Sequence, residues 1–194
     1  RMRDTTAFTV DPLTLIHTQD AARGNYNLGF DQIDISFHMS STETQRSYDH
    51  EMIHVCGGRT IEKTDDVDGK YKILKSGLGL LADYSKVAHR WINEAVTQKL
   101  TFDLEPIDEG ENRSSHTYDK YVVLYKKILE KIDEKLFLRA YFENTSDSDS
   151  PHPHLDALNE EILRIYGTDL LSEIDVLIEE NGLENVEGML KERL

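Results

Sequence analysis

The sequence holds a single cysteine, Cys56, and no long apolar run. One cysteine cannot form a disulfide within the chain, and disulfides are the usual staples of small secreted domains. No segment approaches the roughly 18 to 20 apolar residues of a membrane-spanning helix. The first residues also lack the basic and then apolar segments of a signal peptide. We therefore expect a cytoplasmic protein, with a signal segment removed from the chain as the alternative.

Basic residues are scarce. The chain has 22 lysines and arginines against 37 aspartates and glutamates, a formal net charge of −15. Such a surface repels phosphate backbones and anionic lipid, which argues against nucleic-acid and membrane partners. Hydrophobic residues make up 38% of the 194 residues, enough for the core of one compact domain.

Residues 50–54 read His-Glu-x-x-His. On a helix, His50 and His54 lie one above the other on the same face, so both imidazoles can reach one metal ion. Glu51 can then lean towards the remaining ligand of that metal. This pattern is typical of a catalytic zinc that carries an activated water, with the carboxylate as general base.

The residues around this motif predict a helix over 41–56. Ser40 and Glu43 fit a capping box, with Ser40 as the N-cap. Gly57 and Gly58 offer a left-handed stop at the other end. The motif is therefore expected in the last two turns of a capped helix, with Cys56 pointing away from the metal as a small core residue.

Short strands are expected before this helix, at residues 7–10, 13–17 and 32–39. In the last of these, apolar and polar residues alternate with the period of a half-buried strand, the apolar ones being Ile33, Ile35 and Phe37. Residues 20–29 are rich in Gly, Asn and Asp and are expected to form a loop.

After the motif, residues 59–64 and 70–75 predict a β-hairpin with an Asp-Gly turn. A long helix is expected over 83–101, where Trp91 and its neighbours form an apolar stripe. Glu94 points from that same stripe. A lone carboxylate there would be costly to desolvate, so it needs a cation.

The rest of the chain is expected to be a loop at 102–115 and then helices. These are predicted at 117–132, 134–142, 155–166, 169–180 and 184–193. A linker is expected at 143–153. The segment His152-Pro153-His154 at its end could bind a metal, but we expect a mobile loop there, and His17, His38 and His89 are expected to be structural. We expect a catalytic core over residues 1–101 and a helical subdomain over 102–194, packed as one compact unit.

The segment 91–98, Trp-Ile-Asn-Glu-Ala-Val-Thr-Gln, resembles the Asn-Glu-x-x-Ser/Thr element of gluzincins, the thermolysin-like zinc metallopeptidases. Together with His50-Glu51-x-x-His54 it most resembles the small bacterial peptidases called MA-like, over about residues 33–101. The resemblance implies an α+β, zincin-like fold with one zinc ion. His50, His54 and Glu94 would be its ligands, and Glu51 would polarise the water and protonate the leaving amine.

The resemblance also implies a layout and supporting groups. The edge strand of an upper mixed sheet, expected at 32–39, would run along the cleft and pair with an extended substrate. Gln98 stands where thermolysin-like enzymes have an aspartate, and its amide oxygen would orient a ligand histidine. For the oxyanion donor we favour Tyr118, with Tyr121 and His116 as alternatives.

We therefore expect a zinc metallopeptidase, with endopeptidase preferred, acting on a peptide or protein substrate. One alternative is a catalytically silent member of the same fold that binds a protein segment, which would have no need for Glu51. Another is a zinc amidase or deacetylase with a non-peptide substrate. A third is an interaction protein that acts through its C-terminal helices, with a structural zinc. Structural zinc normally has four protein ligands, and the sequence offers three.

Overall fold

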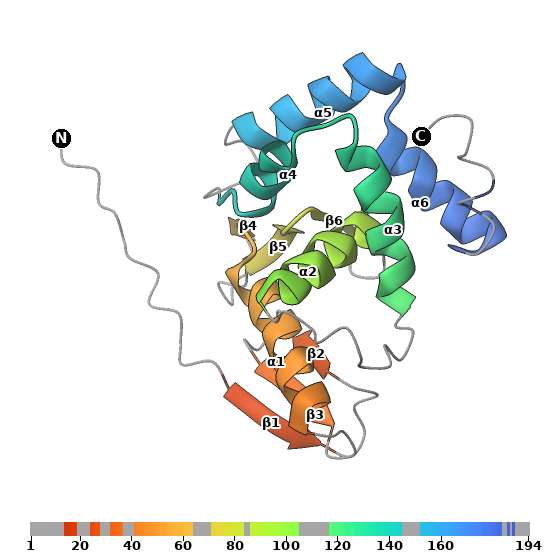
Figure 1. Ribbon diagram of the computed structural model, residues 1–194. Helices are drawn as coiled ribbons and strands as arrows, with labels where there is room; N and C mark the ends of the chain where they lie inside the picture. Colours follow the sequence, from red (N-terminus) through yellow and green to blue (C-terminus); the bar gives the residue numbers. More distant parts are fainter. Residues whose placement is uncertain are drawn as a thin grey trace. The chain divides into compact units, whose positions relative to one another are not determined.

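The computed structural model describes residues 14–18, 24–27, 32–36, 41–63, 71–83, 86–104, 117–144 and 152–183, together with 186 and 188. The chain forms two compact units, residues 1–55 and 56–194 (Figure 1). Helices and two small sheets make the described chain α+β, as predicted. The functional subdivision into residues 1–101 and 102–194 stays a prediction.

The first unit contains a three-stranded mixed sheet. Its strands β1 (Thr14–Thr18), β2 (Gly24–Asn27) and β3 (Gln32–Ser36) lie in the order β1-β3-β2. Strand β3 is parallel to β1 and antiparallel to β2. Ile33 and Ile35 are buried, with Asp34 less so, which confirms the predicted alternation.

Two predictions for this unit are wrong. The sequence placed the strand at residue 32 on the edge of the sheet, but β3 is the central strand. The expected loop at 20–29 contains β2. Gly24-Asn25-Tyr26-Asn27 has no β-branched residue, so its pairing with β3 rather than its own propensity makes it a strand. The strand expected at 7–10 lies outside the described residues.

Helix α1 (Ser41–Cys56) has the bounds that the sequence predicted. Ser40 lies outside the described residues, so the capping box stays a prediction. Neither Gly57 nor Gly58 has a positive φ, and the predicted left-handed stop is wrong. Cys56, the last residue of α1, is exposed, so the prediction of a small core residue is wrong.

The second unit begins with an antiparallel sheet in the order β4-β5-β6-β7. Strands β4 (Arg59–Lys63) and β5 (Tyr71–Ser76) are the predicted hairpin, with the turn outside the described residues. The sequence missed β6 (Gly79–Asp83) and β7 (Lys86–Ala88). The apolar residues at 87 and 88 were expected in the helix, but pairing of β7 with β6 makes them part of a strand.

Five helices follow in the described part of this unit. They are α2 (Arg90–Leu104), α3 (Thr117–Leu129), α4 (Glu134–Tyr141), α5 (Pro153–Tyr166) and α6 (Leu170–Asn181). Helix α2 begins seven residues later than predicted and runs past 101, so part of the expected loop at 102–115 is helical. Gly167 and Gly182 end α5 and α6 with positive φ, as their positions between helices suggest.

Helix α2 packs against α3, β6, α4 and α6, and α4 packs against α5 (Figure 1). The core between them is large and mostly aromatic or branched, and it includes Trp91 as predicted. Its most deeply buried members include Trp91, Ile92, Leu124, Tyr125, Phe137, Tyr141, Leu158 and Leu171. Helix α2 is therefore held on several sides, which matters because it carries Glu94.

The segment His152-Pro153-His154 does not form a loop as expected, since His152 is the N-cap of α5 and the next two residues are the first of that helix. Proline suits this position because its missing N–H has no helical partner there.

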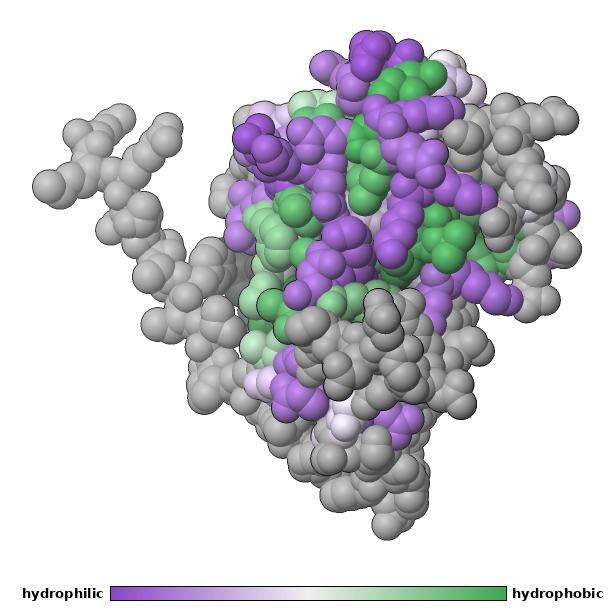
Figure 2. Space-filling view, in the orientation of Figure 1, coloured by the Kyte–Doolittle hydropathy of each residue, from purple (hydrophilic) through white to green (hydrophobic). Residues whose placement is uncertain are grey.

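On the face shown in Figure 2, hydrophilic residues cover most of the described surface of the second unit, with narrow hydrophobic bands between them. Among the described helices, none is long and apolar enough to cross a membrane.

Candidate metal centre

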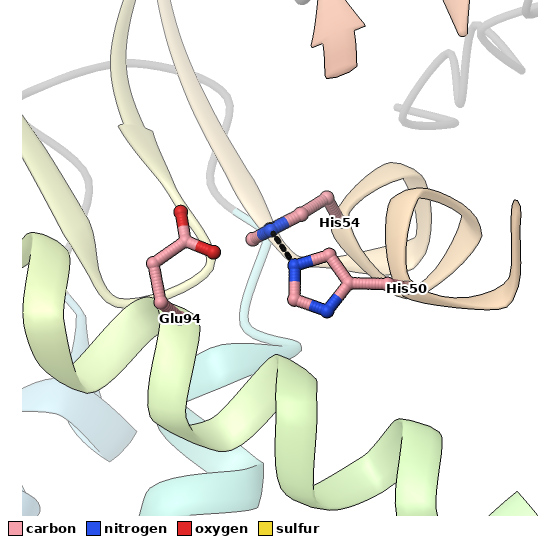
Figure 3. A group of neighbouring side chains, drawn as sticks. All are labelled: His50, His54 and Glu94. Carbon is pink, nitrogen blue, oxygen red and sulfur yellow. Dashed lines mark hydrogen bonds between the residues drawn. The ribbon is translucent and has the colours of Figure 1, made fainter. Parts of the chain in front are cut away.

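Helix α1 brings its two histidines into ligand geometry. The Nε2 atoms of His50 and His54 lie 3.2 Å apart (Figure 3). Two nitrogens bound tetrahedrally at about 2.0–2.1 Å from a zinc ion would be about 3.3–3.4 Å apart. The same spacing allows one ring to donate a hydrogen bond to the other when no metal is bound. The pair is thus already set at the separation that chelation requires.

Glu51 follows His50 directly, about 100° further around α1. Its side chain is buried at 8% exposure, and His50 is buried at 6%. Burying a carboxylate is unfavourable unless a charge or hydrogen bond compensates it. Glu51 is therefore a buried carboxylate that directly follows the first histidine of the pair, and its role as a general base stays a prediction.

Glu94 comes from α2, in the second unit. One ligand atom from each of His50, His54 and Glu94 lies within 4.8 Å of the others, and Figure 3 shows the three side chains directed toward one another. This group is able to hold a metal ion. The structure thus brings together the three residues that the sequence predicted as metal ligands.

The start of α2 is anchored by α6. The Trp91 indole N–H donates to the Leu171 carbonyl at 3.2 Å, and His89 Nε2 lies 3.0 Å from Ser172 Oγ. The backbone N–H of His89 donates to the Asp175 carboxylate. Burial raises the pKa of Asp175, and the hydrogen bond from His89 offsets part of that rise. His89 is therefore structural, as predicted, and fixes the first turn of the helix that carries Glu94.

Two tyrosines of α3 were predicted as oxyanion donors. The rings of Tyr118 and Tyr121 are stacked with their centroids 6.0 Å apart. Burial raises the pKa of Tyr121; the Arg90 cation opposes this rise, and the negative charges of Glu94 and Asp175 add to it. Tyr121 therefore lies within electrostatic reach of Glu94. The choice of Tyr118 stays a prediction, and His116 lies outside the described residues.

Gln98 is buried at 7% exposure, one turn beyond Glu94 on α2. Its predicted role as the partner of a ligand histidine stays a prediction. Sequence reasoning gave no role to Asn93 and Thr97, which flank Glu94 and make hydrogen bonds within the second unit. The signal for them was present, since both are fixed positions of the Asn-Glu-x-x-Thr element.

No protein-family model, curated protein or solved structure matches this chain. The resemblance to gluzincins therefore rests on the two motifs, and the possible metal site on the proximity of His50, His54 and Glu94.

Proposed function

We propose that this chain is a zinc metallopeptidase of gluzincin type with a zincin-like fold. The observation that carries the proposal is the 3.2 Å separation of the His50 and His54 Nε2 atoms in a group that also contains Glu94. His50 and His54 come from α1 and Glu94 from α2. All three would hold a single zinc ion.

The donor set fits a catalytic ion. Two imidazoles and one carboxylate leave the fourth tetrahedral position open, as in catalytic rather than structural zinc sites. The same donors also suit non-haem iron(II). The spacing of the histidines on a helix, with a glutamate directly after the first, favours zinc.

Zinc, when bound, would lower the pKa of a coordinated water to about 7 and polarise the substrate carbonyl. Glu51 accepts the proton of the attacking water and returns it to the amine that leaves. Its side chain is buried, at 8% exposure, on the same helix as the two histidines. A tyrosine hydroxyl of α3, Tyr118 or Tyr121, donates to the oxyanion.

The substrate in this proposal is a peptide or protein cleaved within its chain. The test is cleavage of a mixed peptide library by the wild type and by Glu51→Gln, with metal analysis of both. The amide keeps the size of the side chain but cannot accept a proton. We expect Glu51→Gln to retain one zinc per chain and to lose cleavage by at least about 10²- to 10⁴-fold, the usual contribution of a general base.

His50→Ala is the matched control, and it should lose both zinc and cleavage. Unchanged cleavage by Glu51→Gln would remove Glu51 from the mechanism. Stoichiometric iron in place of zinc, or zinc binding without cleavage of any peptide in the library, would contradict the proposed activity.

A further inference from the structure

We propose that Asn93 and Thr97 are positioning residues that fix the rotation of α2 about its axis and so aim the Glu94 carboxylate. The inference rests on the proposed function, because it concerns the third ligand of the same zinc site. It assigns a role to the two fixed positions of the Asn-Glu-x-x-Thr element that do not bind the metal. All of the contacts that carry it lie within residues 56–194.

Asn93 binds the tight turn between β5 and β6. Its Oδ1 atom accepts a hydrogen bond of 2.9 Å from the backbone N–H of Leu78. The preceding residue, Gly77, has a φ of 57°, and a Cβ atom there would lie 2.2 Å from Asn93 Oδ1. The turn therefore approaches the asparagine so closely that only glycine fits, and the hydrogen bond holds the side chain in that narrow space.

Thr97 binds the neighbouring helix on the same side of α2. It lies four residues after Asn93, one turn along the same face. Its Oγ1 donates to the Asn93 carbonyl at 2.8 Å and is 2.8 Å from the Tyr141 hydroxyl. Because the threonine proton is used on the carbonyl, the Tyr141 proton makes the second bond. Both side chains are fully buried.

Tyr141 is itself fixed at its other end. Its carbonyl accepts a 2.7 Å hydrogen bond from the N–H of Gly58, and a Cβ atom at Gly77 would lie 2.8 Å from its ring. Gly58 is four residues along the chain from His54. Tyr141 thus connects the helix that carries Glu94 to the segment that follows the two histidines.

These contacts control rotation, which is the motion that matters for a ligand. Side chains reach about 5–6 Å from a helix axis, so a rotation of about 10° moves a carboxylate by about 1 Å. Metal–ligand distances tolerate deviations of only about 0.2 Å. Asn93 and Thr97 meet two different elements, the turn and α4, so together they resist rotation in both directions.

The experiment compares zinc affinities, measured by competition with a chromophoric chelator. Asn93→Ala and Thr97→Val should each weaken zinc binding by about 10- to 100-fold, the usual effect of removing a group that orients a ligand. Thr97→Ser keeps the hydroxyl and Asn93→Asp keeps the acceptor, so both should bind zinc nearly as well as the wild type. Cobalt substitution should give an altered visible spectrum in the first two variants and a normal one in the others.

Ile162→Val in the core of α5 serves as the stability control, because Ile162 is buried far along the chain from the ligands. If Asn93 and Thr97 are only structural, Asn93→Ala and Thr97→Val should lower the melting temperature as Ile162→Val does. Their zinc affinities should then equal that of Ile162→Val. That result would overturn the inference. If Asn93→Ala does not fold, the Thr97→Val and Thr97→Ser pair decides the question.

Failure of the proposed function gives a different result. In that case the wild type binds no zinc, or His50→Ala binds it as tightly as the wild type. Normal zinc binding by the wild type, loss in His50→Ala and no loss in Asn93→Ala or Thr97→Val would remove only the positioning role.

Discussion

At the scale of single residues, the second unit buries two opposite charges that each stabilise a helix end. Lys75 Nζ donates to the carbonyls of Ala140 at 2.9 Å and Glu143 at 3.2 Å, at the end of α4. The Glu143 carboxylate accepts from the N–H groups of His154 and Leu155, at the start of α5. A cation at a helix C-terminus and an anion at an N-terminus both complement the helix dipole.

Lys75 should make stability depend on pH. Burial lowers its pKa from 10.5 to about 8, and the charge of Glu143 offsets part of that fall. Between these two values the unfolded chain holds a proton that the folded chain has released, so stability rises with pH in this window. Below pH 8 both states are protonated and the whole penalty, of the order of 3 kcal/mol, is present.

The measurement is the free energy of unfolding by urea at pH 7 to 10 for the wild type and Lys75→Met. Methionine removes the titrating group while keeping an unbranched side chain. The difference between the two proteins should change in favour of the wild type as pH rises above 8. A difference that is independent of pH would contradict the shifted pKa.

At the scale of elements, two glycines that follow helices, Gly58 and Gly167, are required for two different reasons. Gly58 has ordinary backbone angles, but a Cβ atom there would lie 2.1 Å from the Glu143 carbonyl oxygen. Gly167 has a φ of 74°, and a Cβ atom there would meet nothing within 4 Å. The first glycine is required by close packing between β4 and the end of α4, and the second by its left-handed conformation.

The two cases predict different losses on substitution by alanine. Gly167→Ala should lose only the conformational term, about 1–2 kcal/mol. Gly58→Ala should lose more, because backbone atoms must move apart and overpacking typically costs about 1–3 kcal/mol before hydrogen bonds are broken. Urea unfolding of both variants tests this, and an equal or smaller loss in Gly58→Ala would contradict the close approach.

The sequence predicted helices better than strands, for a physical reason. The ends of α5 and α6 follow from periodicity and from Gly167 and Gly182, and α1 has the predicted bounds although its glycines do not form the expected stop. Strands β2, β6 and β7 are decided by pairing with a neighbouring strand, β2 with β3, β6 with β5 and β7 with β6. Their residues have weak strand propensity or a helical spacing, so only the pairing decides them.

At the scale of the whole molecule, zinc should stabilise the folded chain, because its proposed ligands come from two different helices. A metal present at 100 times its dissociation constant adds about 2.7 kcal/mol to the free energy of unfolding. For a chain of this size that corresponds to a rise in melting temperature of about 5–10 °C.

The test is calorimetry of the zinc-loaded protein, the chelator-treated protein and Glu94→Ala. Chelation should lower the melting temperature of the wild type, and re-addition of zinc should restore it. Glu94→Ala should respond much less to either treatment. An equal response in Glu94→Ala would place the third ligand elsewhere.

The sequence by itself determined the helix that carries His50 and His54, since i, i+4 spacing is a local property of a helix. It also placed Glu94, directly after Asn93, on the apolar stripe of a second helix. Only the tertiary structure decided that β3 is central, that Gly58 is needed for close packing and that Asn93 and Thr97 bind the turn and α4. These depend on contacts between residues far apart in the chain, which no local pattern contains.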